Sequence, residues 1–213
     1  AQNGAMDHHR PRFAAVGPTA GHGGRAAGLA VLASMDEHTD EAPLQNLDEL
    51  TKDRENPKNP AYRYFAPCGP RYLYPRIGTA TMVALDELKG KGAYLNNPCC
   101  GLLAHNYGEL GDARELAKKN IMHAEKNGTE SIIGDCSSCV AFLKTYPQLF
   151  LKTEDASWRA RATAFAARVH DAIEIYGECA DQLPANVAEG VETVYHDSCR
   201  ALNGQGLKDQ PRR

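Results

Sequence analysis

Residues 93–101 read AYLNNPCCG, and the pattern in this stretch recurs along the chain. Residues 93–96 are a short, mainly apolar run between turn-forming residues, which is typical of a strand. Pro98 favours an extended conformation in the residue before it and ends the strand, while Gly101 permits a sharp turn. The stretch therefore predicts a β-strand that ends in a tight loop carrying two adjacent thiols, Cys99 and Cys100.

Two other predicted strands also end at cysteines. Residues 62–66, YRYFA, form an aromatic strand candidate, and a Pro-Cys-Gly triplet at 67–69 follows it. Residues 131–135, SIIGD, form another candidate, which leads directly to Cys136 and Cys139. The loops after 62–66 and 93–96 carry the same proline and glycine signals, so we expect them to be built alike.

Apolar residues recur at helical spacing in the segments between and after these strands. The pattern predicts helices from 76 to 89, from near 112 to 127, from 136 to about 146, and from 157 to 177. A fourth strand is expected at 191–195. Strands that alternate with helices of these lengths imply crossover units around a parallel sheet. The predicted fold class is α/β, a parallel sheet with flanking helices, preceded by a largely irregular N-terminal segment.

The predicted strands bring five sulfur atoms to one edge of the sheet. The carboxyl ends of parallel strands share an edge, so thiols that follow three strands can meet there. The last two cysteines also open a helix, whose free amides and dipole favour thiolate over thiol. The sequence therefore predicts one site with the ligands Cys68, Cys99, Cys100, Cys136 and Cys139.

The cysteine chemistry leaves two metal centres open. The chain holds seven cysteines, and an odd number without a secretion signal favours reduced thiols over a disulfide framework. A disulfide between adjacent Cys99 and Cys100 would strain the peptide between them. Zinc remains a competitor because four thiolates make a stable tetrahedral site. A fifth sulfur and an adjacent pair suit a polynuclear iron–sulfur centre better, whereas Cys179 is expected to be a buried apolar residue.

Composition bounds the remaining possibilities. The chain has 213 residues, with 42% hydrophobic and 24% charged, so a packed core is expected. The formal net charge of -3 argues against nucleic-acid binding. We expect neither a membrane span nor a secretory signal and predict a cytoplasmic location. Residues 1–59 are predicted to be a linker or a partly disordered segment, and that reading is favoured over a dinucleotide site at the glycine-rich residues 21–26.

The string Cys68-x30-Cys99-Cys100-Gly101-x34-Cys136-x2-Cys139 resembles the cysteine-rich CCG domain. That family includes chains of heterodisulfide reductase and of the anaerobic glycerol-3-phosphate dehydrogenase, the glycolate oxidase iron-sulfur subunit, and lactate-utilisation protein A. The resemblance implies a Rossmann-like first CCG domain over residues 60–185. Residues 186–213 are then the start of a truncated second CCG domain, so the chain is expected to be a piece of a longer polypeptide. Cys199 would be the first ligand of that second site.

The resemblance also implies a cofactor, partners and a role. The five clustered cysteines would bind a 4Fe-4S cluster, cubane or non-cubane, in a metal-binding electron-transport subunit of an oxidoreductase. A flavin-containing dehydrogenase subunit would oxidise a 2-hydroxy acid, glycolate or lactate, and this chain would pass the electrons to a quinone or another acceptor. The location would then be cytoplasmic or peripheral at the inner face of the membrane. His105 and His196 would hydrogen-bond to sulfur or move protons, with a plain surface role as an equal alternative.

Two other functions remain open at this point. A heterodisulfide reductase-like subunit would use the same ligands to act on thiols and disulfides. A zinc-stabilised assembly module would use the thiolates only to hold the fold together.

Overall fold

Four short parallel strands form the centre of the structure, a computed structural model that describes residues 47–52, 57–183, 192 and 194–213. The strands are hydrogen-bonded in the order β2-β1-β3-β4. Their bounds are Tyr62–Tyr64 for β1, Ala93–Tyr94 for β2, Ser131–Gly134 for β3 and Val169–Asp171 for β4. The α/β class with a parallel sheet and flanking helices is therefore confirmed. The glycine-rich residues 21–26 lie outside the described part of the chain.

Helices connect the strands and cover both faces of the sheet. The longer ones are α3 (Pro75–Lys89), α5 (Leu110–Asn127), α6 (Ser137–Lys144) and α7 (Ala156–Ala166). Shorter ones are α2 (Leu47–Leu50), α4 (Leu102–Asn106), α8 (Ala172–Glu178), α9 (Cys199–Gln205), a π-helical turn η1 (Gly69–Leu73), and the 3-10 turns η2 (Tyr146–Leu149), η3 (Thr153–Asp155), η4 (Ala180–Gln182) and η5 (Gln210–Arg212). The predicted helices at 76–89 and 112–127 agree with α3 and α5 to within two residues.

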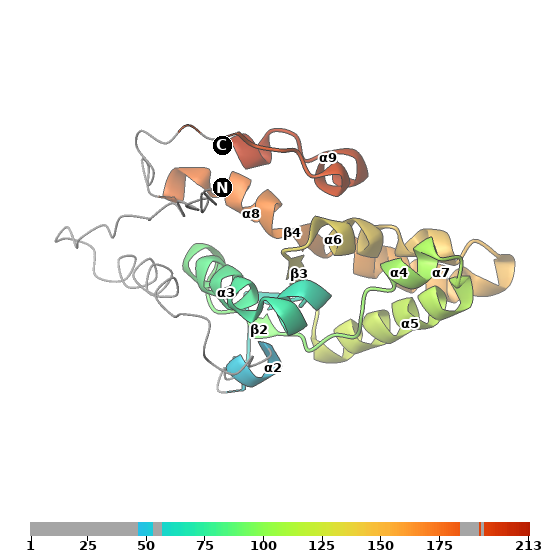
Figure 1. Ribbon diagram of the computed structural model, residues 1–213. Helices are drawn as coiled ribbons and strands as arrows, with labels where there is room; N and C mark the ends of the chain where they lie inside the picture. The colour runs from blue at the N-terminus through green and yellow to red at the C-terminus, as the bar shows by residue number, and fades with distance from the viewer. Residues whose placement is uncertain (1–46, 53–56, 184–191, 193) are drawn as a thin grey trace, which may run out of the picture. The chain divides into compact units, whose positions relative to one another are not determined.

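Two apolar cores lie on opposite faces of the sheet because successive strand side chains point to opposite sides. On β3, Ile132 belongs to the core shared with α5, α6 and α7, whereas Ile133 belongs to the core shared with α2, α3 and α8. Figure 1 shows α3 and α8 on one side of the strands and α5 and α7 on the other. The cysteine-bearing loops emerge at the edge of this layered arrangement.

The predicted helix over 157–177 is wrong in its middle. The chain leaves α7 at Ala166, forms β4 and then begins α8. Backbone pairing with β3 holds this break, since the amide of Ile132 donates to the carbonyl oxygen of Arg168 at 2.7 Å. Asp171 then starts α8 with a capping box, in which its side chain accepts from Ile173 and Glu174 bonds back to the Asp171 backbone. The Asp-x-x-Glu signal is present in the sequence but lies within a continuous apolar stripe.

The strand predicted at 191–195 is therefore not the fourth strand. Residues 191 and 193 lie outside the described part, and the described residues Glu192, Val194 and Tyr195 are not in a strand. Val194 is 98% exposed. The Val194 side chain is therefore apolar but does not pack in the core of the sheet.

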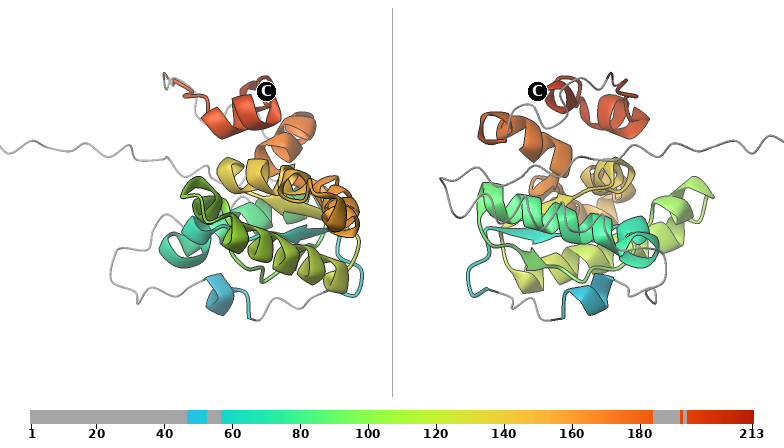
Figure 2. Two further views of the ribbon diagram at one scale, coloured as in Figure 1. Left: turned by 90° about the vertical axis from the view of Figure 1, so that its right-hand side faces the viewer. Right: turned by 60° about the vertical axis from the view of Figure 1, so that its left-hand side comes forward.

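Two segments outside the predicted first domain pack on it. Leu47 of α2, within the expected linker, is fully buried, and a Cβ at Gly78 of α3 would lie 2.7 Å from its side chain. At the other end, α9 packs against α6 and η5 against α8 (Figure 2, red). Gly204 makes the first contact close, because a Cβ there would lie 3.1 Å from the Cβ of Ala141. In the described residues, none of the helices has the length and apolar character needed to cross a membrane.

Candidate metal centre

The strand order brings the cysteine loops side by side. Cys68 follows β1, the pair Cys99 and Cys100 follows β2, and Cys136 and Cys139 follow β3. Because β1 lies between β2 and β3, the three loops leave adjacent carboxyl ends. This is the edge at which open α/β sheets build their binding sites.

Four of the five sulfur atoms form two close pairs, and Cys136 lies near one of them. The Sγ atoms of Cys100 and Cys139 are 3.3 Å apart, and those of Cys68 and Cys99 are 3.8 Å apart. Cys99 and Cys100, and likewise Cys136 and Cys139, are also close enough to shift each other's pKa values. The expected convergence is therefore confirmed. We name these five residues the thiol cluster.

The thiol cluster runs from the core to the surface. Cys100 is 4% exposed and Cys139 is 8% exposed, Cys136 is half-buried, and Cys68 and Cys99 are exposed. One end is thus shielded from water and the other is open to it. Within the described ranges, no three His, Cys, Asp or Glu side chains already surround a position for a metal ion.

Hydrogen bonding within the thiol cluster favours two thiolates. The pKa of Cys100 falls to about 3, because Cys139 and Cys99 share their protons with it and the Leu102 amide also bonds to it. The pKa of Cys136 falls to about 6, because Cys139 shares its proton and amides at the start of α6 point at the sulfur. The pKa values of Cys99 and Cys139 rise, first because each shares its proton with Cys100 and then through burial. Thiolate is the form that binds a metal.

A buried asparagine that no sequence motif had indicated joins two of the loops. Asn97 is 1% exposed, and its Oδ1 accepts from the amide of Ala66 at 2.7 Å. Its Nδ2 donates to the carbonyl oxygens of Ala66 at 3.1 Å and Pro98 at 2.9 Å. The side chain therefore sets the spacing between the loop that leads to Cys68 and the loop that holds the vicinal pair. Its place before Pro98 predicts an extended backbone but neither the burial of the side chain nor these bonds.

The two proline-containing loops are not built alike, contrary to expectation. Gly101 has φ +88°, and a Cβ there would lie 3.3 Å from the Cβ of Leu116. Its conformation and its close contact with α5 both favour glycine. Gly69 instead begins η1, and no atom lies within 4 Å of where its Cβ would be. The two loops lead into differently packed segments, since α4 contacts α5 whereas η1 contacts α3 and α2.

The other predicted site residues lie at the surface. His105 on α4 is exposed, and its ring packs 5.1 Å from the ring of Phe142. His196 and Cys199 are exposed at the start of the α9 segment. In the described part of the chain, the sulfur–sulfur contacts do not include Cys199. Its role as a ligand of a second site, and the roles of both histidines, stay predictions. Cys179 is buried at 8% exposure in the core with α3 and α8, as expected.

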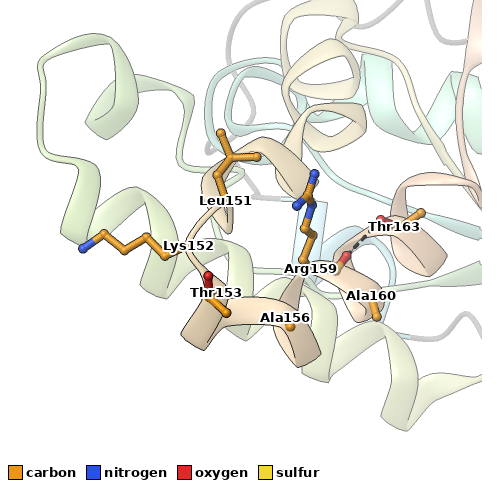
Figure 3. Close-up of a pocket in the computed structure, with 7 residues that line it drawn as sticks. All are labelled: Leu151, Lys152, Thr153, Ala156, Arg159, Ala160 and Thr163. Carbon is orange, nitrogen blue, oxygen red and sulfur yellow. Dashed lines mark hydrogen bonds between the residues drawn. The ribbon is translucent and has the colours of Figure 1, made fainter.

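A surface hollow lies elsewhere, before and along α7 (Figure 3). Its volume is about 530 Å³. Its lining contains none of the cysteines and consists of Leu151, Lys152, Thr153, Ala156, Arg159, Ala160 and Thr163. It brings no thiol or carboxylate together and is not part of the thiol cluster.

Comparisons with known proteins agree with this geometry. Residues 62–144 match the family model for the CCG cysteine-rich domain. Lactate utilization protein A of an Exiguobacterium species is 29% identical over 153 residues, which are 71% of this chain and 62% of that protein. The Geobacillus kaustophilus protein of that name is 29% identical over 150 residues, 70% of this chain and 61% of its own length. The Macrococcus caseolyticus protein is 31% identical over 140 residues, covering 63% and 54%.

The chain thus spans about three-fifths of the length of the first two relatives. No solved structure gives a significant match.

Proposed function

Because residues 62–144 form a cysteine-rich domain of the CCG family, we propose that this chain is an iron–sulfur electron-transfer subunit that serves the oxidation of lactate. The observation that carries the proposal is the thiol cluster, in which cysteines from three adjacent strand ends lie together, with Cys68 and Cys99 in contact and Cys100 and Cys139 in contact. The relatives named for lactate utilization support the choice of substrate class.

The donor set fits an iron–sulfur cluster. Soft thiolate ligands favour such clusters, and five sulfurs with a vicinal pair exceed the four that a tetrahedral zinc site takes. A 4Fe-4S cluster, cubane or non-cubane, would supply reversible one-electron storage when bound. Cys100, Cys136 and Cys139 would hold its shielded side, and Cys68 and Cys99 its solvent side.

The protein supplies the surroundings of that centre. The buried end of the thiol cluster excludes water, and amides at the start of α6 point toward sulfur, as the lowered pKa of Cys136 reflects. Hydrogen bonds to sulfur and burial set the potential of such centres. The exposed end at Cys68 and Cys99 gives a redox partner a short path for electrons.

The partners follow from the chemistry of hydroxy-acid oxidation. We assign the removal of two electrons from lactate, or from glycolate as the related alternative, to a flavin in another subunit, because a flavin can take two electrons together and release them one at a time. The present chain would take these electrons one at a time and pass them to a quinone or another acceptor. A cytoplasmic location with peripheral contact at the inner face of the membrane belongs to the same proposal.

The exposed pair Cys68 and Cys99 favours one second candidate, a heterodisulfide reductase-like subunit. Solvent-facing sulfur is accessible to a disulfide substrate. Turnover of disulfides by the iron-loaded protein with a low-potential donor would favour this function, and absence of turnover would favour the relay.

The decisive experiment is purification without oxygen, followed by iron and acid-labile sulfide analysis and EPR. We expect a cluster in the wild type, its loss in Cys139→Ser, and its retention in the matched variant Cys179→Ser. Cys139 and Cys179 are each 8% exposed, so both changes place a hydroxyl in an equally buried site. Stoichiometric zinc with no iron–sulfur absorption, and unfolding by a chelator, would instead identify an assembly module. Correctly folded protein that takes up no metal would contradict both the iron–sulfur subunit and the zinc-stabilised assembly module.

A further inference from the structure

Two buried polar side chains hold the backbone of the vicinal cysteine pair. Asn120 of α5 is 1% exposed and Tyr146 of η2 is fully buried. The Nδ2 of Asn120 donates to the carbonyl oxygen of Cys99 at 2.9 Å, and the Tyr146 hydroxyl donates to the carbonyl oxygen of Cys100 at 2.7 Å. The two side chains also bond to each other, since the Asn120 Nδ2 lies 3.1 Å from the Tyr146 hydroxyl oxygen.

These bonds fix two consecutive peptide planes. The carbonyls belong to the peptides that join Cys99 to Cys100 and Cys100 to Gly101, and each peptide is planar. When a plane is held at its oxygen, the direction of the neighbouring Cα–Cβ bonds is restricted as well. The two bonds therefore restrict the directions in which the Cβ atoms of both cysteines point.

Tyr146 cannot easily move away from this position. Its ring is stacked on Phe165 at 5.5 Å and meets Phe142 edge-on at 5.6 Å. Phe142 lies in α6, the helix that carries Cys139. Tyr146 therefore links the loop that holds Cys99 and Cys100 to the helix that carries Cys139. The Sγ atoms of Cys100 and Cys139 lie 3.3 Å apart.

We propose that Asn120 and Tyr146 are positioning residues that preorganise the vicinal pair against Cys139 for metal capture. The iron-binding part of this inference rests on the proposed function, whereas preorganisation of the thiols does not. Neither residue contributes a ligand atom. They restrict the loop before a metal binds, so the loop loses less conformational entropy on binding. The affinity of the thiols for the metal is therefore higher.

The test compares two losses of a buried hydroxyl. Tyr146→Phe removes the donor to Cys100 and keeps the ring. Tyr62→Phe is the matched control, because Tyr62 is also fully buried and bonds to Met82 and Asp86, but it lies in the core of the opposite sheet face. The full chain, freed of metal under anaerobic conditions, is titrated with Cd²⁺, and the thiolate-to-cadmium absorption reports the affinity and the number of bound sulfurs.

We expect Tyr146→Phe to weaken Cd²⁺ binding about tenfold, mainly through loss of the buried bond to the Cys100 carbonyl, and Tyr62→Phe to change it less than about twofold. Equal losses in the two variants would overturn the proposal, because they would show a general effect on stability. Wild-type affinity in Tyr146→Phe would overturn it as well. Should Tyr146→Phe fail to fold, Asn120→Ala removes the bond to the Cys99 carbonyl together with the bonds to Leu116 and Tyr146, and the same comparison with Tyr62→Phe decides.

The proposed function can fail separately. A wild type that takes up no iron, combined with a selective loss of Cd²⁺ affinity in Tyr146→Phe, would refute the electron relay and support the positioning role. If the wild type binds iron and Tyr146→Phe keeps the same Cd²⁺ affinity and reduction potential, the positioning role is refuted and the electron relay is supported.

Discussion

Replacing Asn97 with alanine tests whether one side chain holds the two cysteine loops at their spacing. The change removes both bonds to Ala66 and the bond to Pro98. Because the site is 1% exposed, the Ala66 amide and carbonyl are left without these partners in the core. A buried backbone group that loses its partner costs about 1–3 kcal/mol. Some water will enter the space of the lost amide, so we expect a total of about 3 kcal/mol.

Two measurements check this value. Urea unfolding of the metal-free chain gives the free energy of unfolding, and a loss of about 3 kcal/mol corresponds to a fall in Tm of roughly 6–12 °C for a domain of this size. Amide hydrogen exchange gives the local effect, since the Ala66 amide should exchange faster. Asn106→Ala, at an exposed position of α4, is the control and should change stability by no more than about 0.5 kcal/mol.

A loss below about 1 kcal/mol in Asn97→Ala, with unchanged exchange at Ala66, would refute the reasoning. It would mean that the loops keep their spacing through the sheet alone. A large global loss without faster exchange at Ala66 would place the effect elsewhere in the fold.

The remaining predictions concern pH and backbone conformation. Bonds from His170 and Lys144 lower the pKa of Glu174 from 4.5 to about 2; the stability this provides is complete above pH 4.5 and lost as the pH falls toward 2. After solvent screening it amounts to about 1.5 kcal/mol, so Glu174→Gln should flatten the acid limb of the unfolding profile, and an unchanged profile would contradict the assignment. Gly101→Ala, at φ +88°, should lower the free energy of unfolding in urea by about 1–2 kcal/mol and reduce the iron–sulfur content of the anaerobically purified protein. Gly69→Ala should change neither quantity.

Local signals were sufficient for the α/β class and for the convergence of five thiols. Proline, glycine and the apolar spacing act over a few residues, so they located β1, β2, β3, α3 and α5 from the sequence. Parallel pairing then requires the strand ends to share an edge, which made the meeting of Cys68 with Cys99 and of Cys100 with Cys139 predictable.

Packing between distant segments decided the rest. The stretch that forms β4 has an apolar pattern that suits a helix equally well, and only its pairing with β3 selects the strand. The sequence does not mark Asn97, Asn120 or Tyr146 as special residues. Their long-range hydrogen bonds go to backbone groups of Ala66, Cys99 and Cys100, which lie 21 to 46 positions away along the chain. A buried hydrogen bond depends on which backbone group the folded chain leaves without a partner. That need arises only after the strands and helices have packed, so no local pattern could predict it.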